Sequence, residues 1–261
     1  MQTKTNKIVF IGAGNLATQL ARQLVRKGFC ISQVFSRTVF SAQTLAESIN
    51  ANYTNSTDEI DKNADLYICA LKDDALPEVL NRLPDIKGII VHTAGSVEMA
   101  VFEGKFKKYG VFYPLQTFSK TREVDFSTIP IFVEASDLET LQQLKKFVSC
   151  ISEKVYEADS YQRKMLHLSA VFTCNFVNHL YAQADEIVKK SGFDFDVLLP
   201  LIDETAQKIH YLNPIDAQTG PAVRFDETVM QKHLSLLAGD ENKEQIYRLI
   251  SRIIHEKTKS D

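Results

Sequence analysis

Residues 7–29, KIVFIGAGNLATQLARQLVRKGF, constrain the fold of this chain more than any other stretch. An apolar, β-branched run at residues 8–11 is typical of a buried parallel strand. Glycines follow it at once, and from Leu16 onward apolar residues recur at helical spacing until a basic pair and Gly28 end the run. A strand, a glycine turn and a helix are therefore expected in direct succession.

The turn has the spacing of a dinucleotide-binding site. Gly12 permits a tight turn, Gly14 lets a pyrophosphate approach the backbone, and Ala17 lets the helix pack against the strand. The pyrophosphate would lie on the backbone N–H groups of Asn15 and Leu16, which are unpaired donors at the positive end of the helix. The alternative is a tight turn with only a structural role.

The end of the second strand indicates which dinucleotide binds. An NAD site usually places Asp or Glu about 20 residues after the glycines. Here Ser36, Arg37 and Thr38 occupy that position, and the first carboxylate of the chain is Glu47. Arg37 can bind a 2′-phosphate through charge-assisted hydrogen bonds, and the two hydroxyls can donate to it as well. NADP is therefore predicted rather than NAD, although Arg37 could instead only cap or solvate the next helix.

Strand and helix patterns alternate through the rest of the first half. Buried strand patterns cover residues 64–71, 88–96, 108–114, 129–135 and 153–158. They predict a doubly wound, mainly parallel Rossmann sheet over residues 1–158. Ligands of such sheets bind beyond the carboxyl ends of the strands. The residues expected beside the cofactor at two strand ends are Ala70, Leu71, Lys72, Thr93, Ala94 and Gly95. His92 ends a buried strand, where a structural histidine is favoured over a catalytic one.

The second half, residues 159–261, is expected to be an all-helical domain for substrate binding and dimerisation. Asp159 or Ser160 caps a helix that is apolar almost all round, so most of it should be buried. Further helices are expected near residues 194–211, 226–238 and 241–256. Because these helices are too apolar and too few to close a core alone, a homodimer through this domain is predicted.

Composition narrows the classes of partner. A chain of 261 residues with 44% apolar side chains can form two domains, and a net charge of -3 offers no basic surface for nucleic acid or an anionic membrane. The four cysteines lack metal-ligand spacing, which predicts reduced core residues, no metal site and a cytoplasmic location. No signal region or stretch of about 20 apolar residues is present. A small-molecule partner is therefore expected.

Several motifs together resemble one known family over nearly the whole chain. They are FIGAGNLA, SRT, ADLYICALKDDAL, HTAGS, YPLQTF and TGPAVRFD. These motifs resemble the Rossmann-like NADP oxidoreductases whose C-terminal domain is of unknown function. That family is similar in architecture to pyrroline-5-carboxylate reductase, to the 6-phosphogluconate and 3-hydroxyisobutyrate dehydrogenases, and to deazaflavin-linked NADP oxidoreductases. The resemblance implies hydride transfer between NADP(H) and a small metabolite such as an imine or an oxoacid.

Catalytic candidates follow from the same resemblance. The 3-hydroxyacid dehydrogenases carry Lys-x-x-x-Asn on the first long helix of the second domain; here Asn175 matches the asparagine, but Val171 stands at the lysine position. YPLQTF is similar to the His-Pro motif of prephenate dehydrogenases, with Tyr113 in place of the histidine. His167 or Tyr113 is expected to donate the proton that accompanies hydride transfer. Two alternatives remain. In one, His167 only takes part in a hydrogen-bond network of the core. In the other, the chain senses NADP(H) or a metabolite without catalysis, and the missing lysine favours this second alternative.

Overall fold

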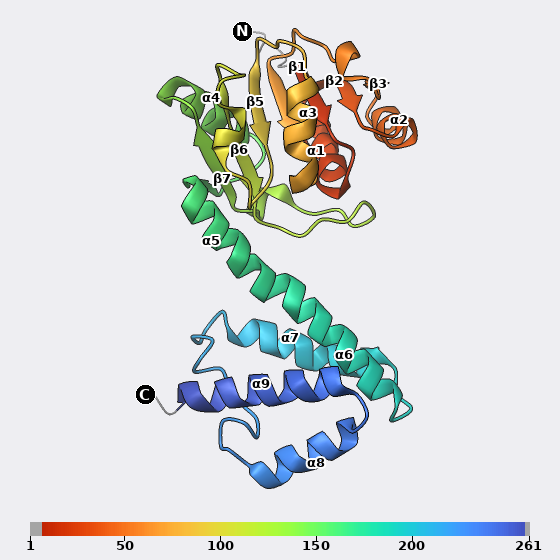
Figure 1. The fold of residues 1–261 in the computed structure, drawn as a ribbon, viewed down its shortest axis with the longest axis vertical. Helices are drawn as coiled ribbons and strands as arrows, with labels where there is room; N and C mark the ends of the chain where they lie inside the picture. Colours follow the sequence, from red (N-terminus) through yellow and green to blue (C-terminus); the bar gives the residue numbers. More distant parts are fainter. Residues whose placement is uncertain (1–6, 259–261) are drawn as a thin grey trace. The chain divides into compact units, whose positions relative to one another are not determined.

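The computed structural model describes residues 7–258, which form two compact units. The first unit ends at Asn175 and the second begins at Phe176. Figure 1 shows the elements of both units. The last strand ends earlier, at Glu157. The predicted domain boundary after residue 158 therefore coincides with the end of the sheet. The division into domains at that residue stays a prediction.

The first unit contains an eight-stranded sheet in the order β3-β2-β1-β4-β5-β6-β7-β8. The strands are β1 (Lys7–Ile11), β2 (Cys30–Phe35), β3 (Asn52–Thr54), β4 (Leu66–Cys69), β5 (Ile89–His92), β6 (Tyr109–Pro114), β7 (Ile131–Ala135) and β8 (Val155–Glu157). Neighbouring strands are parallel except β6 and β7. The prediction of a doubly wound, mainly parallel sheet is thus confirmed. The order reverses between β1 and β4, which is where such sheets bind ligands.

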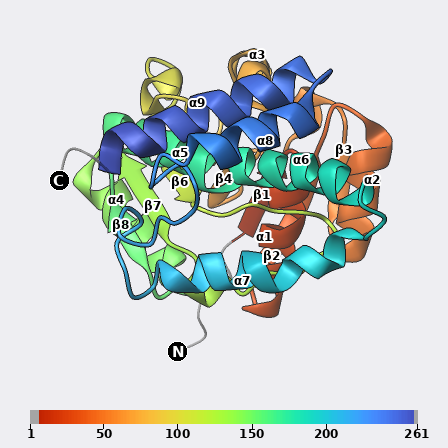
Figure 2. The same cartoon turned by 90° about the horizontal axis from the view of Figure 1, so that it is seen from below.

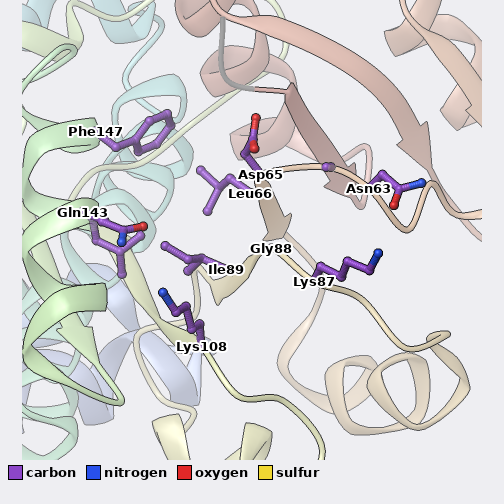
Figure 3. Close-up of a pocket in the computed structure, with 11 residues that line it drawn as sticks. Asn63, Asp65, Leu66, Lys87, Gly88, Ile89, Lys108, Gln143 and Phe147 are labelled. Atoms are coloured by element: carbon purple, nitrogen blue, oxygen red, sulfur yellow. The ribbon is translucent and has the colours of Figure 1, made fainter. Parts of the chain in front are cut away.

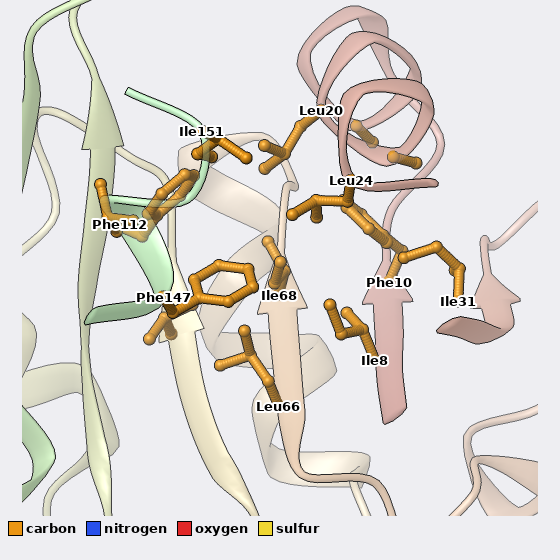
Figure 4. Packing of buried hydrophobic residues seen from close by; sticks show 14 of the residues in the cluster. Ile8, Phe10, Leu20, Leu24, Ile31, Leu66, Ile68, Phe112, Phe147 and Ile151 are labelled. Atoms are coloured by element: carbon orange, nitrogen blue, oxygen red, sulfur yellow. The ribbon is translucent and has the colours of Figure 1, made fainter. Parts of the chain in front are cut away.

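Both faces of the sheet are covered by helices. The helices of this part are α1 (Asn15–Arg26), α2 (Val39–Ser48), α3 (Leu76–Arg82) and α4 (Leu138–Val148). Because successive strand residues point to opposite faces, Ile8 and Phe10 join one core cluster, whereas Val9 and Ile11 join another. Figure 4 shows the first cluster, in which Leu20 and Leu24 of α1, Ile68 of β4 and Phe147 of α4 take part. These two cores fix the strand ends that carry the candidate site.

The helical part begins with α5 (Ser160–Ala170), followed by a π-helical segment (Val171–Phe176) and α6 (Val177–Lys189). Asp159 caps α5: its side chain accepts from the Gln162 N–H, and the Gln162 side chain accepts from the Asp159 N–H in return. The remaining helices are α7 (Leu199–Lys208), α8 (Glu227–Leu237) and α9 (Glu241–Thr258). They match the predicted positions. Short 3-10 turns lie at Thr57–Glu59, Asp73–Ala75, Met99–Phe102, Phe126–Thr128 and Phe195–Leu198.

The second unit buries few apolar side chains. α8 and α9 pack against each other (Figures 1 and 2), yet among its described residues only Ala222 and Leu234 are buried apolar residues. The prediction that the long helix is mostly buried is wrong for the single chain, since Arg163 is the only buried residue of α5 and α6 has none. Several of the long helix's large apolar side chains are exposed instead, among them Leu168, Phe172 and Leu180. No helix within residues 7–258 is long and apolar enough to cross a membrane.

Candidate functional site

The glycine turn connects the ends of three strands. Gly12 has a φ of +119°, and a Cβ there would lie 2.2 Å from the carbonyl oxygen of Ala70. Its N–H donates to the Phe35 carbonyl at 2.8 Å, and the Ala70 N–H donates to Ile11 at 2.9 Å. Only glycine fits this position. The turn therefore lies directly at the switch point of the sheet.

The first turn of α1 is open to an anion. Gly14 is the N-cap, no side chain caps the helix, and the first turn contains no acidic residue. A Cβ on Gly14 would meet nothing within 4 Å, whereas Ala17 is fully buried against the sheet. The backbone N–H groups of the exposed Asn15 and the half-buried Leu16 therefore have no side-chain acceptor and fit a pyrophosphate.

The end of β2 offers a second anion-binding position. Ser36 is half-buried, and Arg37 and Thr38 are exposed. Thr38 is the N-cap of α2, but its hydroxyl lies 2.8 Å from that of Ser41 and does not cap the helix. The first turn of α2 contains no acidic residue. Arg37 beside a helix N-terminus without a side-chain cap fits a 2′-phosphate.

The remaining predicted cofactor residues lie at the same edge of the sheet. β4 and β5 pair in parallel register, so their carboxyl ends are adjacent. After β4, Ala70 and Leu71 are half-buried and Lys72 is exposed; after β5, Thr93 and Gly95 are buried. A Leu71 methyl carbon lies 3.3 Å from where a Gly12 Cβ would be. The ends of β4 and β5, which the sequence predicts beside the cofactor, thus lie next to each other in the structure.

His92 holds the turn that follows β5. Its side chain is fully buried and stacks on Phe102 at 5.5 Å between ring centroids. The Ala94 N–H donates to His92 Nδ1 at 3.2 Å. Burial lowers the pKa of His92 to about 3, so the ring is neutral near pH 7. These contacts favour the structural interpretation of this histidine.

Tyr113 and His167 form a pair beside the same turn. Tyr113 Oη lies 3.1 Å from His167 Nδ1, and the rings meet edge to face at 6.2 Å. A Cβ on Gly95 would lie 2.7 Å from the His167 ring, so the ring can approach only because this residue is glycine. Burial raises the pKa of Tyr113 to about 12, which keeps the phenol protonated. Two titratable groups thus face the carboxyl end of β5.

A buried ion pair anchors α5, which carries His167. Arg163 is 1% exposed and binds Glu134 of β7 through a short contact. The Arg163 guanidinium also donates to the Val97 carbonyl at 2.5 Å, and Ser160 Oγ lies 3.0 Å from Glu134. His167 follows one turn later, so this pair determines where the imidazole lies. Sequence reasoning missed Arg163 and Glu134, because Arg163 stands between Gln162 and Lys164 in a polar first turn and nothing local marks it as buried.

Asn175 does not lie beside the Tyr113–His167 pair. It is exposed and lies in the π-helical segment, eight residues after His167 and thus about 12 Å along a helix at 1.5 Å per residue. No hydrogen bond joins it to Tyr113 or His167 within the described part of the chain. Its candidacy rests on the resemblance alone.

Two cavities lie elsewhere. One of about 530 Å³ lies at the amino ends of β4 and β5, where Leu66 and Ile89 face Gln143 and Phe147 of α4 (Figure 3). The other, about 520 Å³, lies in the second unit beside Lys243. Neither is at the edge of the sheet that carries the glycine turn. Residues 7–258 hold no group of three or more His, Cys, Asp or Glu side chains placed to bind a metal ion.

Comparison with known families gives two matches. Residues 7–94 match the family described as NADP oxidoreductase, coenzyme F420-dependent, and residues 129–254 match a domain of unknown function, DUF2520. A search of the curated proteins finds no match. The first region covers β1 to β5 with the glycine turn, the second covers β7, β8 and most of the helical part, and β6 lies between the two.

Solved structures extend these matches over the full chain. A putative NADP oxidoreductase of Bacteroides fragilis is 55% identical, with 96% of this chain and 98% of that one covered and a TM-score of 0.91. An imine reductase of Aspergillus terreus, solved with NADPH4 and a dibenzazepine, shares the fold at 18% identity, 97% and 95% coverage and a TM-score of 0.65. A pyrroline-5-carboxylate reductase of Coxiella burnetii shares it at 16% identity, 98% coverage of both chains and a TM-score of 0.58. The chain therefore belongs to the family of NADP oxidoreductases in which a Rossmann domain is followed by a DUF2520 domain.

Proposed function

We propose that this oxidoreductase transfers a hydride between NADP(H) and the carbon of a C=N or C=O group in a small metabolite. The observation that carries the proposal is the Tyr113–His167 pair, which lies against Gly95 at the edge of the sheet that also holds the glycine turn. A proton donor beside the carboxyl ends of the strands is what such a reduction requires.

The cofactor would be held by backbone and side-chain groups of the first unit. The N–H groups at the start of α1 would bind the pyrophosphate, and Arg37 with the start of α2 would bind the 2′-phosphate. The residues after β4 and β5 would line the ribose and the nicotinamide. Bound NADPH supplies the hydride; the protein supplies orientation, exclusion of water and the proton.

The proton would come from the imidazolium form of His167. In that form Nδ1–H donates to the Tyr113 oxygen, which can accept it because the phenol stays a neutral O–H group, and Nε2–H can donate to the substrate. Nε2 would give its proton to the nitrogen or oxygen of the C=N or C=O group as the hydride reaches the carbon, and a neutral imidazole would remain. A positioned general acid contributes roughly 10²- to 10⁴-fold to the rate. Tyr113 would act by holding the orientation of the imidazole.

The carboxylate of Asp73 favours an imine over an oxoacid as the substrate. Asp73, just after β4, accepts a short hydrogen bond from Ser96 Oγ. Burial is the main cause of the raised pKa of Tyr113; the cation of Arg163, which is paired with Glu134, opposes it, and Asp73 adds to it. None of the ion pairs found within residues 7–258 includes Asp73. A C=N group that becomes cationic when His167 protonates it would be stabilised beside Asp73, whereas a carboxylate placed there would be repelled.

A substrate screen tests the proposal. NADPH oxidation would be followed with cyclic imines, 2-oxoacids and 3-oxoacids, with NADH as the matched cofactor control. We expect turnover with NADPH and imines, reduced at least tenfold in His167→Asn. The alternative function, binding of NADP(H) or a metabolite without catalysis, predicts tight NADPH binding but no oxidation with any of these compounds.

Assembly and location complete the proposal. The helical part would form a homodimer, because it leaves large apolar side chains exposed, including Leu201, Leu236 and Phe193. A cytoplasmic location is supported by four free cysteines and no disulfide among the described residues.

A further inference from the structure

The segment that follows β6 is attached to the helix of the glycine turn. We call residues 115–123 the strap; it leaves Tyr113 and Pro114 at the end of β6 and passes along α1 (Figure 1). Most of its side chains are exposed, but Phe118 is half-buried and stacks on Phe126 with ring centroids 5.7 Å apart. The strap is thus held at its middle and connects two parts of the candidate site.

Two amide side chains of α1 hold the backbone of the strap. Gln19 Nε2 donates to the carbonyls of Ser119 at 2.6 Å and Lys120 at 3.3 Å, and Asn15 Nδ2 donates to Phe118 at 3.0 Å. Asn15 and Gln19 are one helical turn apart and therefore share a face. Further contacts, such as the exposed Arg26–Glu123 ion pair at 2.5 Å, contribute little.

Gln19 is unusual for its position. It is 4% exposed on the buried face of α1, beside Leu20 and Ala17, where an apolar side chain would pack without any polar requirement. A buried amide is costly unless its hydrogen bonds are made. Both acceptors of Gln19 are strap carbonyls about 100 residues away in the sequence. Gln19 is therefore the buried side chain of α1 whose hydrogen bonds depend on the strap conformation.

We propose that Gln19 is a positioning residue that couples cofactor binding to the strap. The inference rests on the proposed function, in which the Asn15 N–H binds the pyrophosphate. The side chain of Asn15 donates to the Phe118 carbonyl, so an anion bound to the backbone N–H of Asn15 restrains the same residue that holds the strap. By linkage, a strap held by Gln19 strengthens cofactor binding, and a bound cofactor holds the strap closed.

Limited trypsin digestion measures strap opening directly, since Lys120 and Arg122 lie within the strap. Cleavage there requires local opening, and its rate follows the population of the open state. We expect NADPH to slow cleavage after these two residues at least fivefold in the wild type. Gln19→Leu should speed their cleavage about tenfold without cofactor and weaken NADPH binding three- to tenfold, as followed by NADPH fluorescence.

The matched control is Gln23→Leu, the same change one turn later on α1, because the Gln23 side chain makes no hydrogen bond described within residues 7–258. It should change neither measurement. Gln19→Met keeps the side-chain length and should reproduce Gln19→Leu if the leucine variant folds poorly. Unchanged cleavage in both Gln19 variants, or NADPH binding without protection of the strap, would overturn the coupling. If the Gln19 variants are cleaved fast, and neither the wild type nor any variant binds NADPH, both the coupling and the proposed function are overturned.

Discussion

Arg37 is the residue on which the preference for NADP is expected to depend. It is exposed beside the start of α2, which lacks a side-chain cap, and no carboxylate precedes Glu47. A charged hydrogen bond contributes about 1.5 to 3 kcal/mol, or roughly 10- to 150-fold in affinity. Arg37→Ala should weaken NADPH binding by this factor and leave NADH binding unchanged. Fluorescence titration checks it, with Arg82→Ala as a control; equal wild-type affinities for the two cofactors would contradict it.

Substitution of His167 distinguishes a catalytic role of this residue from a role in core stability. If it donates the proton, His167→Asn should lower turnover at least tenfold, while NADPH affinity and the melting temperature barely change. Tyr113→Phe, which removes the hydroxyl 3.1 Å from Nδ1, should also lower turnover without weakening NADPH binding. A His167→Asn protein that loses about 1 to 3 kcal/mol of stability but keeps its turnover would show that the imidazole only satisfies a core network.

His92 should make the free energy of unfolding sensitive to acid. Burial lowers its pKa from 6.5 to about 3, so below pH 6.5 the unfolded chain binds a proton that the folded chain excludes. Stability should therefore fall as the pH drops from 6.5 towards 3, by up to about 1.4 kcal/mol per pH unit. His92→Asn, whose Oδ1 can accept from the Ala94 N–H, should remove this contribution in urea titrations at several pH values. His210→Asn, at an exposed site, should keep the wild-type slope.

At the scale of elements, α5 depends on its buried ion pair. Arg163→Met would leave Glu134 uncompensated in a site where the guanidinium is 1% exposed, and should cost about 3 to 5 kcal/mol in urea unfolding. The double variant Arg163→Met/Glu134→Gln should recover part of that loss. The exposed pair of Arg82 and Glu78 on α3 is the control, because breaking it should cost under about 0.5 kcal/mol. Equal losses at the two sites would contradict the anchoring role.

For the whole molecule, the exposed apolar surface predicts a dimer. The second unit has only two buried apolar residues among those described, and α6 and α7 expose Leu180, Ile187 and Leu201. A unit with so small a core is expected to be stable only if a second copy covers it. Light scattering at micromolar concentration should give about twice the chain mass of 29.5 kDa. Leu201→Glu should shift the mass towards the monomer, and a wild-type mass near 30 kDa would argue against the dimer.

Local sequence pattern was sufficient for most of the fold and for the strand ends that carry the candidate site. The strand, glycine turn and helix of residues 7–29, and the strand ends after β4 and β5, could be predicted because each depends on hydrophobic periodicity within a few residues. β3 was missed because it has three residues and two of them are exposed. Parallel sheets then bring the carboxyl ends to one edge whatever the loops contain.

Only the tertiary structure decided which distant side chains meet. Tyr113 and His167 are 54 residues apart, and Gln19 and Ser119 are 100 apart; the Arg163–Glu134 pair likewise joins a helix to a strand. Such contacts depend on strand register and on how α5 docks, which no local periodicity encodes. The apolar pattern of the long helix predicted burial, but in one chain α6 has no buried residue. Periodicity tells which face of a helix avoids water, whereas the surface that covers that face is set by tertiary and quaternary packing.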